Sequence, residues 1–188
     1  MKAIEVINFG SNLLRKNKIP SHILDSELLL SKTLNKSREE ILVNLDQIIN
    51  EKNFLVFKEY LNRRSKNEPI AYILREKEFW SEKFSVNKHT LIPRPETELL
   101  VDKILKLYNG KKPSILDIGT GSGCIVISLL HNLKNSKGIG IDISKNAILT
   151  AEINALKHNL SNRVKFLNKS FNDIFDKKFD LIVSNPPY

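Results

Sequence analysis

Cysteine is nearly absent from the sequence, and long apolar runs are missing. The single cysteine, Cys124, excludes an internal disulfide and a metal site built from several cysteines, so we assign no metal. No apolar run approaches the roughly 18 to 20 residues that span a bilayer. The N-terminus has neither the apolar core nor the cleavage site of a signal peptide. These absences predict a cytoplasmic protein with no membrane partner.

Glycine is also scarce, with seven residues in a chain of 188, and Gly10 is the one glycine before residue 110. A glycine-poor segment with helical spacing predicts a helix bundle, and a glycine-bearing segment with short β-branched runs predicts an α/β fold. The length allows one domain or two small ones. We therefore expect a helical domain at 1–75, a hairpin and linker at 76–95, and an α/β domain at 96–188.

The net charge is +9, from 30 Lys and Arg against 21 Asp and Glu. A basic surface suits polyanionic partners such as RNA. The chain is also rich in Lys, Asn and Ile, as an AT-rich coding sequence would make it, and no block of like charge stands out. Both interpretations stay open.

Apolar spacing in the first part predicts helices. Their apolar faces comprise Ile4, Ile7 and Leu14; Ile23, Leu30 and Leu34, widened by Leu24 and Leu28; and Phe54, Phe57 and Leu61. A capping box at Ser37 and Glu40 opens a short helix that ends near Val43. The runs 78–80 and 84–86 predict the two strands of a hairpin, joined by 81–83.

From residue 96 the pattern changes to alternating helices and strands. We expect helices at 96–108, 124–133 and 144–158, and strands at 114–117, 138–142, 163–167 and 179–184. Strands that alternate with helices are typical of a parallel sheet with right-handed crossovers. The fold class is therefore α/β, with a Rossmann-like parallel sheet of which four strands can be placed.

A glycine-dense turn follows the first strand of this sheet, in the order Asp117-Ile118-Gly119-Thr120-Gly121-Ser122-Gly123. Such a turn lets backbone N–H groups approach a ligand, and the following helix N-terminus favours a carboxylate or phosphate. The spacing G-x-G-x-G differs from the dinucleotide pattern G-x-G-x-x-G. A diphosphate would be repelled by Asp117, whereas a ligand that carries an ammonium group would be attracted. The alternative is a plain strand-to-helix turn.

Asp142 ends the second strand, 19 residues after Gly123. A carboxylate at this position can accept hydrogen bonds from both hydroxyls of a ribose. The alternative is that Asp142 only caps the helix that begins near Ser144.

A third motif, Asn185-Pro186-Pro187-Tyr188, follows the last strand. Ligands of open α/β sheets bind at this carboxyl edge. The two prolines stiffen the backbone and leave carbonyl acceptors, and Asn185 adds a side-chain acceptor. Two acceptors suit a planar NH₂ group, and Tyr188 can cover its flat face. The alternative is a turn that merely ends a strand.

The three motifs together resemble those of class I S-adenosylmethionine-dependent methyltransferases. A narrower resemblance, to the HemK family of peptide chain release factor glutamine methyltransferases, rests on 67–74, 78–80 and 91–98, which read NEPIAYIL, EFW and LIPRPETE. It covers essentially the whole chain, with departures at Asn67 and Arg75, where the family usually has glycine.

The resemblance implies a role for each motif. The turn from Gly119 through Gly123 would cradle the methionyl part of S-adenosylmethionine, Asp142 would hold its ribose, and Phe171 would lie near the adenine. Phe171 could equally be a core residue paired with Phe175. Asn185 and the Pro186 carbonyl would be catalytic, binding the substrate amide with Pro187 and Tyr188 beside it. Arg94, Glu96 and Glu98 either line this site or form an ion-paired connector.

The family further implies a monomer that methylates the glutamine of the Gly-Gly-Gln motif in class 1 peptide chain release factors, without needing nucleic acid. Two alternatives remain, a methyltransferase for exocyclic amino groups of RNA or DNA and an inactive remnant. The family has further strands after this last motif. We therefore expect the 188 residues to be part of a longer enzyme or the product of a shortened gene, with weak or no activity. The four histidines are assigned no catalytic role, and Cys124 is expected to pack in the core.

Overall fold

The computed structural model describes residues 1–173 and 177–186, and the chain forms two compact units. The first unit, Met1–Leu74, is called the helical unit below, and the second, which begins at Arg75, is called the sheet unit. Pro187 and Tyr188, which belong to the third motif, lie outside the described residues. In the described part of the chain, no helix combines the length and the apolar character that crossing a membrane requires.

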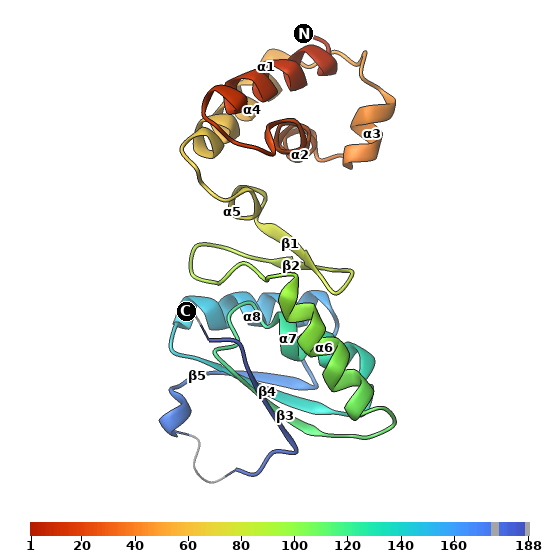
Figure 1. Ribbon diagram of the computed structural model, residues 1–188, viewed down its shortest axis with the longest axis vertical. Coiled ribbons are helices and arrows are strands. Elements are labelled where there is room, and N and C mark those ends of the chain that lie inside the picture. The colour runs from red at the N-terminus through yellow and green to blue at the C-terminus, as the bar shows by residue number, and fades with distance from the viewer. Residues whose placement is uncertain (174–176, 187–188) are drawn as a thin grey trace. The chain divides into compact units, whose positions relative to one another are not determined.

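The helical unit contains α1 (Ala3–Lys16), α2 (His22–Leu34), α3 (Arg38–Val43), α4 (Glu51–Ser65) and α5 (Ile70–Leu74). The capping box expected at the start of α3 is present, because Ser37 Oγ accepts the N–H of Glu40 and the Glu40 carboxylate accepts the N–H of Ser37. In Figure 1, α1, α2 and α4 lie against one another. Gly10 on α1 allows the close approach, since a Cβ there would overlap the Ser26 hydroxyl.

The predicted apolar face of α2 was partly wrong. Ile23 and Leu24 are 56% and 44% exposed, while Leu29 and Leu30 are fully buried. The face is rotated because polar residues of the same turn are held inside the unit. Asp25 is one of them, and its carboxylate accepts hydrogen bonds from Arg64 Nε at 2.7 Å and from the Ser21 hydroxyl at 2.8 Å.

The sheet unit opens with an antiparallel hairpin of β1 (Glu76–Phe79) and β2 (Glu82–Ser85). The expected hairpin is present, but the bounds of its strands and its three-residue connection were wrong, because Trp80 and Ser81 alone form the turn. Both residues have positive φ, 54° and 58°, as a two-residue turn matched to the strand twist requires. The Trp80 N–H donates to Glu98 Oε1 at 3.0 Å, which fixes the turn to α6 (Glu96–Leu107).

The rest of the sheet unit alternates as expected, with α6 (Glu96–Leu107), β3 (Ser114–Ile118), α7 (Cys124–Asn132), β4 (Lys137–Asp142), α8 (Lys145–Lys157), β5 (Val164–Asn168), the short 3₁₀ helix η1 (Phe171–Asp173) and β6 (Leu181–Ser184). The described strands of the main sheet are all parallel and lie in the order β5-β4-β3-β6. In chain order this is 3-2-1-4, one half of a doubly wound sheet and the first strand of the other half, so the predicted fold class is confirmed.

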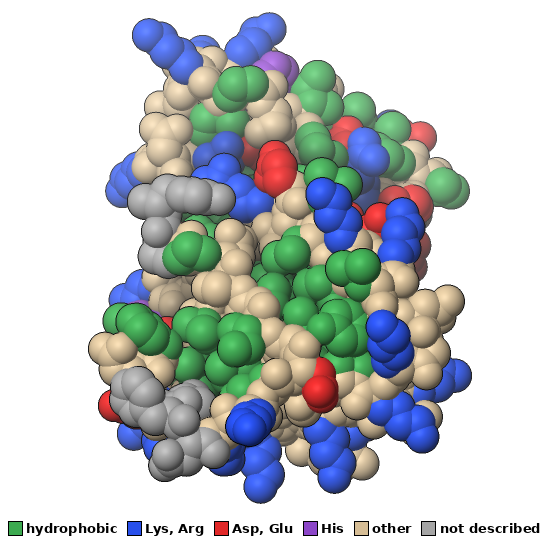
Figure 2. All heavy atoms as spheres, turned by 60° about the horizontal axis from the view of Figure 1, so that its bottom comes forward, with side chains coloured by type: hydrophobic (Ala, Val, Ile, Leu, Met, Phe, Trp, Pro, Cys, Tyr) green, Lys and Arg blue, Asp and Glu red, His purple; other side chains and the backbone are tan. Residues whose placement is uncertain are grey.

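The two faces of this sheet differ. In Figure 1, α6, α7 and α8 lie on the same side of it. Gly138 and Gly140 face these helices, and a Cβ on Gly138 would lie 2.6 Å from Val126 of α7, so α7 packs close to β4. On the opposite face, Ile182 is paired in register with Leu116 and is 59% exposed. Figure 2 shows apolar side chains gathered on this side of the molecule.

Candidate functional site

The carboxyl ends of β3, β4 and β6 bring the three sequence motifs to one edge of the sheet. Ile118 pairs with Ile141 of β4 on one side and with Ser184 of β6 on the other. The glycine turn follows β3, Asp142 ends β4 and Asn185 follows β6. Strand order reverses its direction between β3 and β6, and ligands of open α/β sheets bind at such a point.

The glycine turn is held by backbone hydrogen bonds and leaves room in front of it. The N–H groups of Gly119 and Thr120 both donate to the Ile141 carbonyl at 2.9 Å. Gly119 has a φ of +70°, and a Cβ added there would meet nothing within 4 Å. Gly123 serves packing instead, since a Cβ there would press on Ile127 at 3.0 Å. The turn therefore offers an open surface at Gly119 above a closely packed helix start.

Asp117 is a buried carboxylate with one unsatisfied oxygen. Its side chain is 1% exposed, and Oδ2 accepts the Thr120 hydroxyl at 2.7 Å. Within the described part of the chain, Oδ1 has no hydrogen-bond partner. Burial raises the pKa of Asp117 to about 6, against the opposing effects of the Thr120 hydroxyl and of the Val126 backbone N–H at the start of α7. A buried carboxylate with an oxygen that lacks a hydrogen-bond partner favours the binding of a cationic ligand group.

Asp142 joins the glycine turn to α8. One oxygen accepts the Gly121 N–H at 3.0 Å, and the other accepts the Ser144 N–H at 2.8 Å. Ser144 is itself the N-cap of α8, because its hydroxyl accepts the Ala147 N–H. Ser144 and not Asp142 therefore caps α8, and Asp142 supports the N-cap residue through this one contact. It leaves the ribose role open, because each carboxylate oxygen has a second lone pair.

Asn185 is oriented by α6. Its amide nitrogen donates to Thr97 Oγ1 at 3.0 Å, which makes Oδ1 the remaining acceptor of the side chain. Pro186 is exposed beside it. Thr97 is buried, and sequence reasoning gave it no role although it lies inside the run LIPRPETE. The one sequence feature that could have drawn attention to Thr97 is its position between Glu96 and Glu98.

Asn154 was also missed. It is fully buried on α8 and donates to the carbonyls of Ser122 at 2.8 Å and Ser85 at 3.0 Å, while it accepts the Ser85 N–H at 2.7 Å. One side chain therefore fixes the glycine turn and strand β2 to the same helix. No spacing in the sequence marks such a residue, because its partners lie 32 and 69 positions away.

The remaining residues considered in the sequence analysis are Phe171, the charged residues of 94–98 and Cys124. Phe171 is 62% exposed, so the interpretation that placed it in the core was wrong, and Phe175 lies outside the described residues. Arg94 and Glu96 are exposed, and the described residues form no ion pair with them, while Glu98 holds the hairpin turn. Cys124 is buried and burial raises its pKa to about 12, as suits a packing residue.

Comparisons with known proteins agree with this geometry. Residues 5–74 match the model of the PrmC N-terminal domain, and residues 109–187 match a methyltransferase domain. Fold and site thus define a class I methyltransferase domain preceded by a helical domain. The chain belongs to the PrmC family, which is the HemK family that its motifs indicated.

Two relatives illustrate the match. A bifunctional methyltransferase of Rickettsia felis is 40% identical over 213 residues, which cover 98% of this chain and 40% of the relative. A release factor glutamine methyltransferase of Buchnera aphidicola subsp. Acyrthosiphon pisum is 45% identical over 164 residues, which cover 87% of this chain and 59% of the relative. The chain therefore spans about two fifths to three fifths of these relatives.

Among solved structures, a ribosomal protein L11 methylase of Lactobacillus delbrueckii subsp. bulgaricus aligns with a TM-score of 0.47 at 25% identity. This alignment covers 58% of this chain and 57% of the methylase. It bears on neither substrate nor mechanism.

Proposed function

We propose that the chain provides the cofactor-binding and amide-binding parts of an S-adenosylmethionine-dependent methyltransferase. Its substrate would be the glutamine amide in the Gly-Gly-Gln motif of class 1 peptide chain release factors. The observation that carries the proposal is the meeting of Asp117, Asp142 and Asn185 at one sheet edge in a chain of the PrmC family. The relatives named release factor glutamine methyltransferases support the choice of substrate.

The residues at this edge fit the proposed cofactor. Asp117 Oδ1 would accept a hydrogen bond from the ammonium group of the methionyl part. This ammonium would supply the cationic partner that the buried carboxylate does not have within the described residues. The open side of Gly119 leaves space for the methionyl chain. Asp142 would accept the ribose hydroxyls through its second lone pairs, and Phe171, exposed on η1, would cover the adenine. When bound, the cofactor supplies a methyl group on a sulfonium, which is a good leaving group.

Asn185 and Pro186 would activate the acceptor. An amide nitrogen is a weak nucleophile because its lone pair is delocalised into the carbonyl. Two N–H hydrogen bonds, one to Asn185 Oδ1 and one to the Pro186 carbonyl, would return electron density to nitrogen and stabilise the positive charge that develops there. Thr97 keeps Asn185 in the required orientation. The remaining contribution is alignment of the nitrogen with the methyl group, so no strong base is needed before attack.

The helical unit would recognise the protein substrate. It matches the PrmC N-terminal domain, and its net charge is small for a nucleic-acid module. Residues 1–74 contain twelve Lys and Arg against nine Asp and Glu, a net charge of +3. We therefore favour a release factor over RNA or DNA.

Cofactor binding is tested by calorimetry with S-adenosylhomocysteine. Asp142→Asn keeps the shape but loses the charge, and we expect the affinity to fall roughly 10- to 100-fold, the effect of a charged hydrogen bond. Asp102→Asn is the matched control, since Asp102 is an exposed carboxylate paired with Lys106 on α6. Absence of binding by the unaltered chain, or equal affinities for both variants, would overturn the assignment.

The substrate is tested by single-turnover transfer of a labelled methyl group with the chain in excess, which also detects slow transfer. A release factor and total RNA are offered separately, and a release factor with Gln→Ala in its Gly-Gly-Gln motif is the control. Label on the unaltered factor alone supports the proposal. Label on RNA would favour the base methyltransferase, and cofactor binding without label on either would favour the inactive remnant.

A further inference from the structure

Two histidines and one glutamate lie close together in the sheet unit, at the edge of the sheet opposite to the glycine turn. Glu82 begins β2, His131 lies in the last turn of α7, and His158 is the C-cap of α8. One ligand atom from each lies within 4.8 Å of the other two. Glu82 Oε2 is 3.7 Å from His158 Nδ1, and Glu82 Oε1 is 3.9 Å from His131 Nδ1. These distances are too long for hydrogen bonds.

The tautomer of His158 is fixed by its other ring nitrogen. His158 Nε2 lies 3.2 Å from the Lys83 carbonyl, and a carbonyl can only accept, so Nε2 carries the hydrogen. Nδ1 then turns its lone pair toward a carboxylate oxygen. Two electron-rich atoms in this relation repel unless a proton or a metal cation lies between them. An imidazole that donates one N–H to a backbone carbonyl and offers the other nitrogen is the usual arrangement of a metal-ligating histidine.

The surroundings hold this arrangement in place. The His158 side chain is 8% exposed and its ring lies against the buried Phe84, with centroids 4.7 Å apart. Glu82 and His131 are 39% and 52% exposed, so an ion could enter from solvent. His131 and His158 lie at the C-terminal ends of their helices, where the helix dipoles favour positive charge.

We propose that Glu82, His131 and His158 form a binding site for a divalent transition metal, of which Zn²⁺ is the natural probe. Imidazole and carboxylate ligands suit zinc, and bond lengths of roughly 2.0–2.2 Å place tetrahedral ligand atoms about 3.3 Å apart. The two separations from Glu82, 3.7 and 3.9 Å, need to shorten by about 0.4–0.6 Å, and the two histidine nitrogens, which lie within 4.8 Å of each other, by up to about 1.5 Å through side-chain rotation. A solvent molecule would complete the fourth position.

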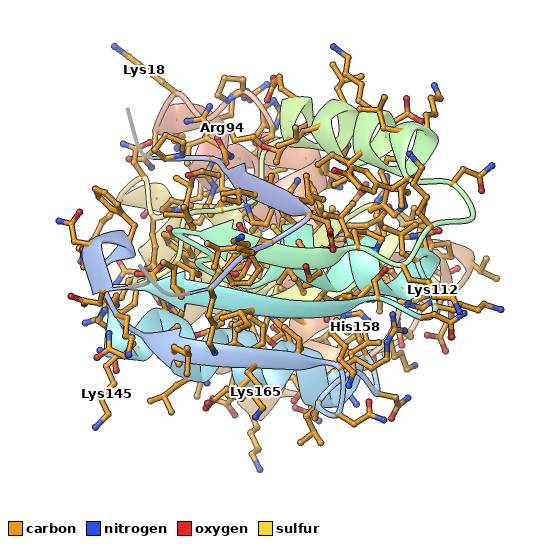
Figure 3. All side chains as sticks on the ribbon, turned by 90° about the horizontal axis from the view of Figure 1, so that it is seen from below. Lys18, Arg94, Lys112, Lys145, His158 and Lys165 are labelled. Carbon is orange, nitrogen blue, oxygen red and sulfur yellow. The ribbon has the colours of Figure 1, made fainter. Side chains whose placement is uncertain are left out.

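The site has a structural role. Helices of a parallel sheet run against the strands, so the C-terminal ends of α7 and α8 lie at the sheet edge opposite to the glycine turn. Figure 3 shows Lys145 and His158, which mark the two ends of α8, at opposite edges of the sheet. A metal here would fasten the β1–β2 hairpin to both helices, away from the proposed cofactor.

The experiment titrates the tag-free chain with Zn²⁺ at pH 7.5 against a chromophoric chelator. We expect one equivalent to bind, and binding to weaken roughly 10- to 100-fold in His131→Ala and in Glu82→Gln. His131 is half-exposed, so its replacement leaves the core intact. His89→Ala, which removes an exposed histidine elsewhere in the sheet unit, should bind as the unaltered chain does.

Thermal unfolding gives a second readout. Zn²⁺ at about 100 times its Kd should raise the unfolding midpoint roughly 5–10 °C, and Mg²⁺, which prefers oxygen ligands, should not. Loss of the Zn²⁺ shift in both His131→Ala and Glu82→Gln would support the site. Failure of the unaltered chain to bind zinc, or equal binding by these two variants and by His89→Ala, would overturn it.

Discussion

Among the residues that the structure describes, each unit buries one aspartate almost completely, and the two side chains have different partners. Asp25 in the helical unit is 2% exposed, and Asp117 in the sheet unit is 1% exposed. Asp25 receives a guanidinium hydrogen bond from Arg64, so its charge is balanced within the chain. Asp117 receives one hydroxyl hydrogen bond, and no cation pairs with it among the described residues.

The difference separates a structural carboxylate from one kept for a ligand. A buried charge is costly unless it is paired, and the helical unit supplies the partner from its own α4. The sheet unit leaves its carboxylate beside an open glycine turn, where a cationic group of a ligand can supply the missing charge. The two largest expected effects test this contrast.

The largest effect is expected when the internal partner is removed. Arg64→Ala leaves Asp25 buried without its cation, and loss of one member of a buried pair costs about 3–5 kcal/mol of folding free energy. Chemical denaturation followed by circular dichroism measures it. Lys106→Ala, which breaks the exposed pair on α6, should cost less than about 1 kcal/mol. Equal costs for the two variants would remove the contrast.

Replacement of Asp117 is expected to raise the folding stability, whereas replacement of Arg64 lowers it. Because the folded pKa of about 6 lies above the usual 3.8, the folded state binds the extra proton between these values. Stability relative to an uncharged residue is therefore lost as pH rises through this window, by up to about 3 kcal/mol at pH 7. Asp117→Asn should stabilise the sheet unit at pH 7 and not at pH 4. Denaturation at both pH values tests this, and destabilisation at pH 7 would contradict it.

A smaller effect on stability should distinguish a glycine needed for helix packing from a glycine that leaves space for a ligand. Gly10→Ala forces a methyl group against Ser26 and Phe57, and we expect a loss of about 1–3 kcal/mol of folding free energy. Gly119→Ala meets no neighbouring atom, so only the strain at φ +70°, about 1 kcal/mol, remains. Its main consequence should be weaker cofactor binding. Thermal unfolding measures the loss of stability in both variants, and calorimetry measures the loss of cofactor affinity. A stability loss in Gly119→Ala that exceeds the loss in Gly10→Ala would contradict this assignment.

The smallest effect concerns the departures from the family pattern. Asn67 and Arg75 stand where glycine is usual, and both keep the left-handed backbone that glycine favours, with φ of 63° and 60°. Arg75→Gly should stabilise the chain by about 0.5–1 kcal/mol. Asn67→Gly should change stability less, because asparagine tolerates this conformation better. Urea denaturation of the two variants measures the difference, and a loss of stability in Arg75→Gly would be the contrary result.

Local signals in the sequence predicted most of the fold. The capping box at Ser37, the N-cap at Ser144 and the glycine turn placed helix starts where the structure has them, because each depends on neighbouring residues alone. The face of α2 could not be predicted, since it follows from a partner, Arg64, 39 positions away. The hairpin turn was misplaced for a related reason, because Trp80 is held by Glu98 of α6.

The same limit applies to the site. Each motif follows its own strand, so the alternation of strands and helices was enough to place the three motifs at one edge. Thr97 and Asn154 escaped notice, because their roles are long-range hydrogen bonds to Asn185 and to Ser85 and Ser122. The unsatisfied oxygen of Asp117 is likewise a property of the packed structure alone.

The central claim, that Asp117 awaits a ligand ammonium, is tested by comparing two ligands on the unaltered chain and Asp117→Asn. S-adenosylhomocysteine carries the ammonium, and 5′-methylthioadenosine retains the ribose and adenine but lacks it. We predict that Asp117→Asn weakens S-adenosylhomocysteine at least about tenfold at pH 8 and leaves methylthioadenosine unchanged. Equal effects on both ligands, or no effect on either, would contradict the claim.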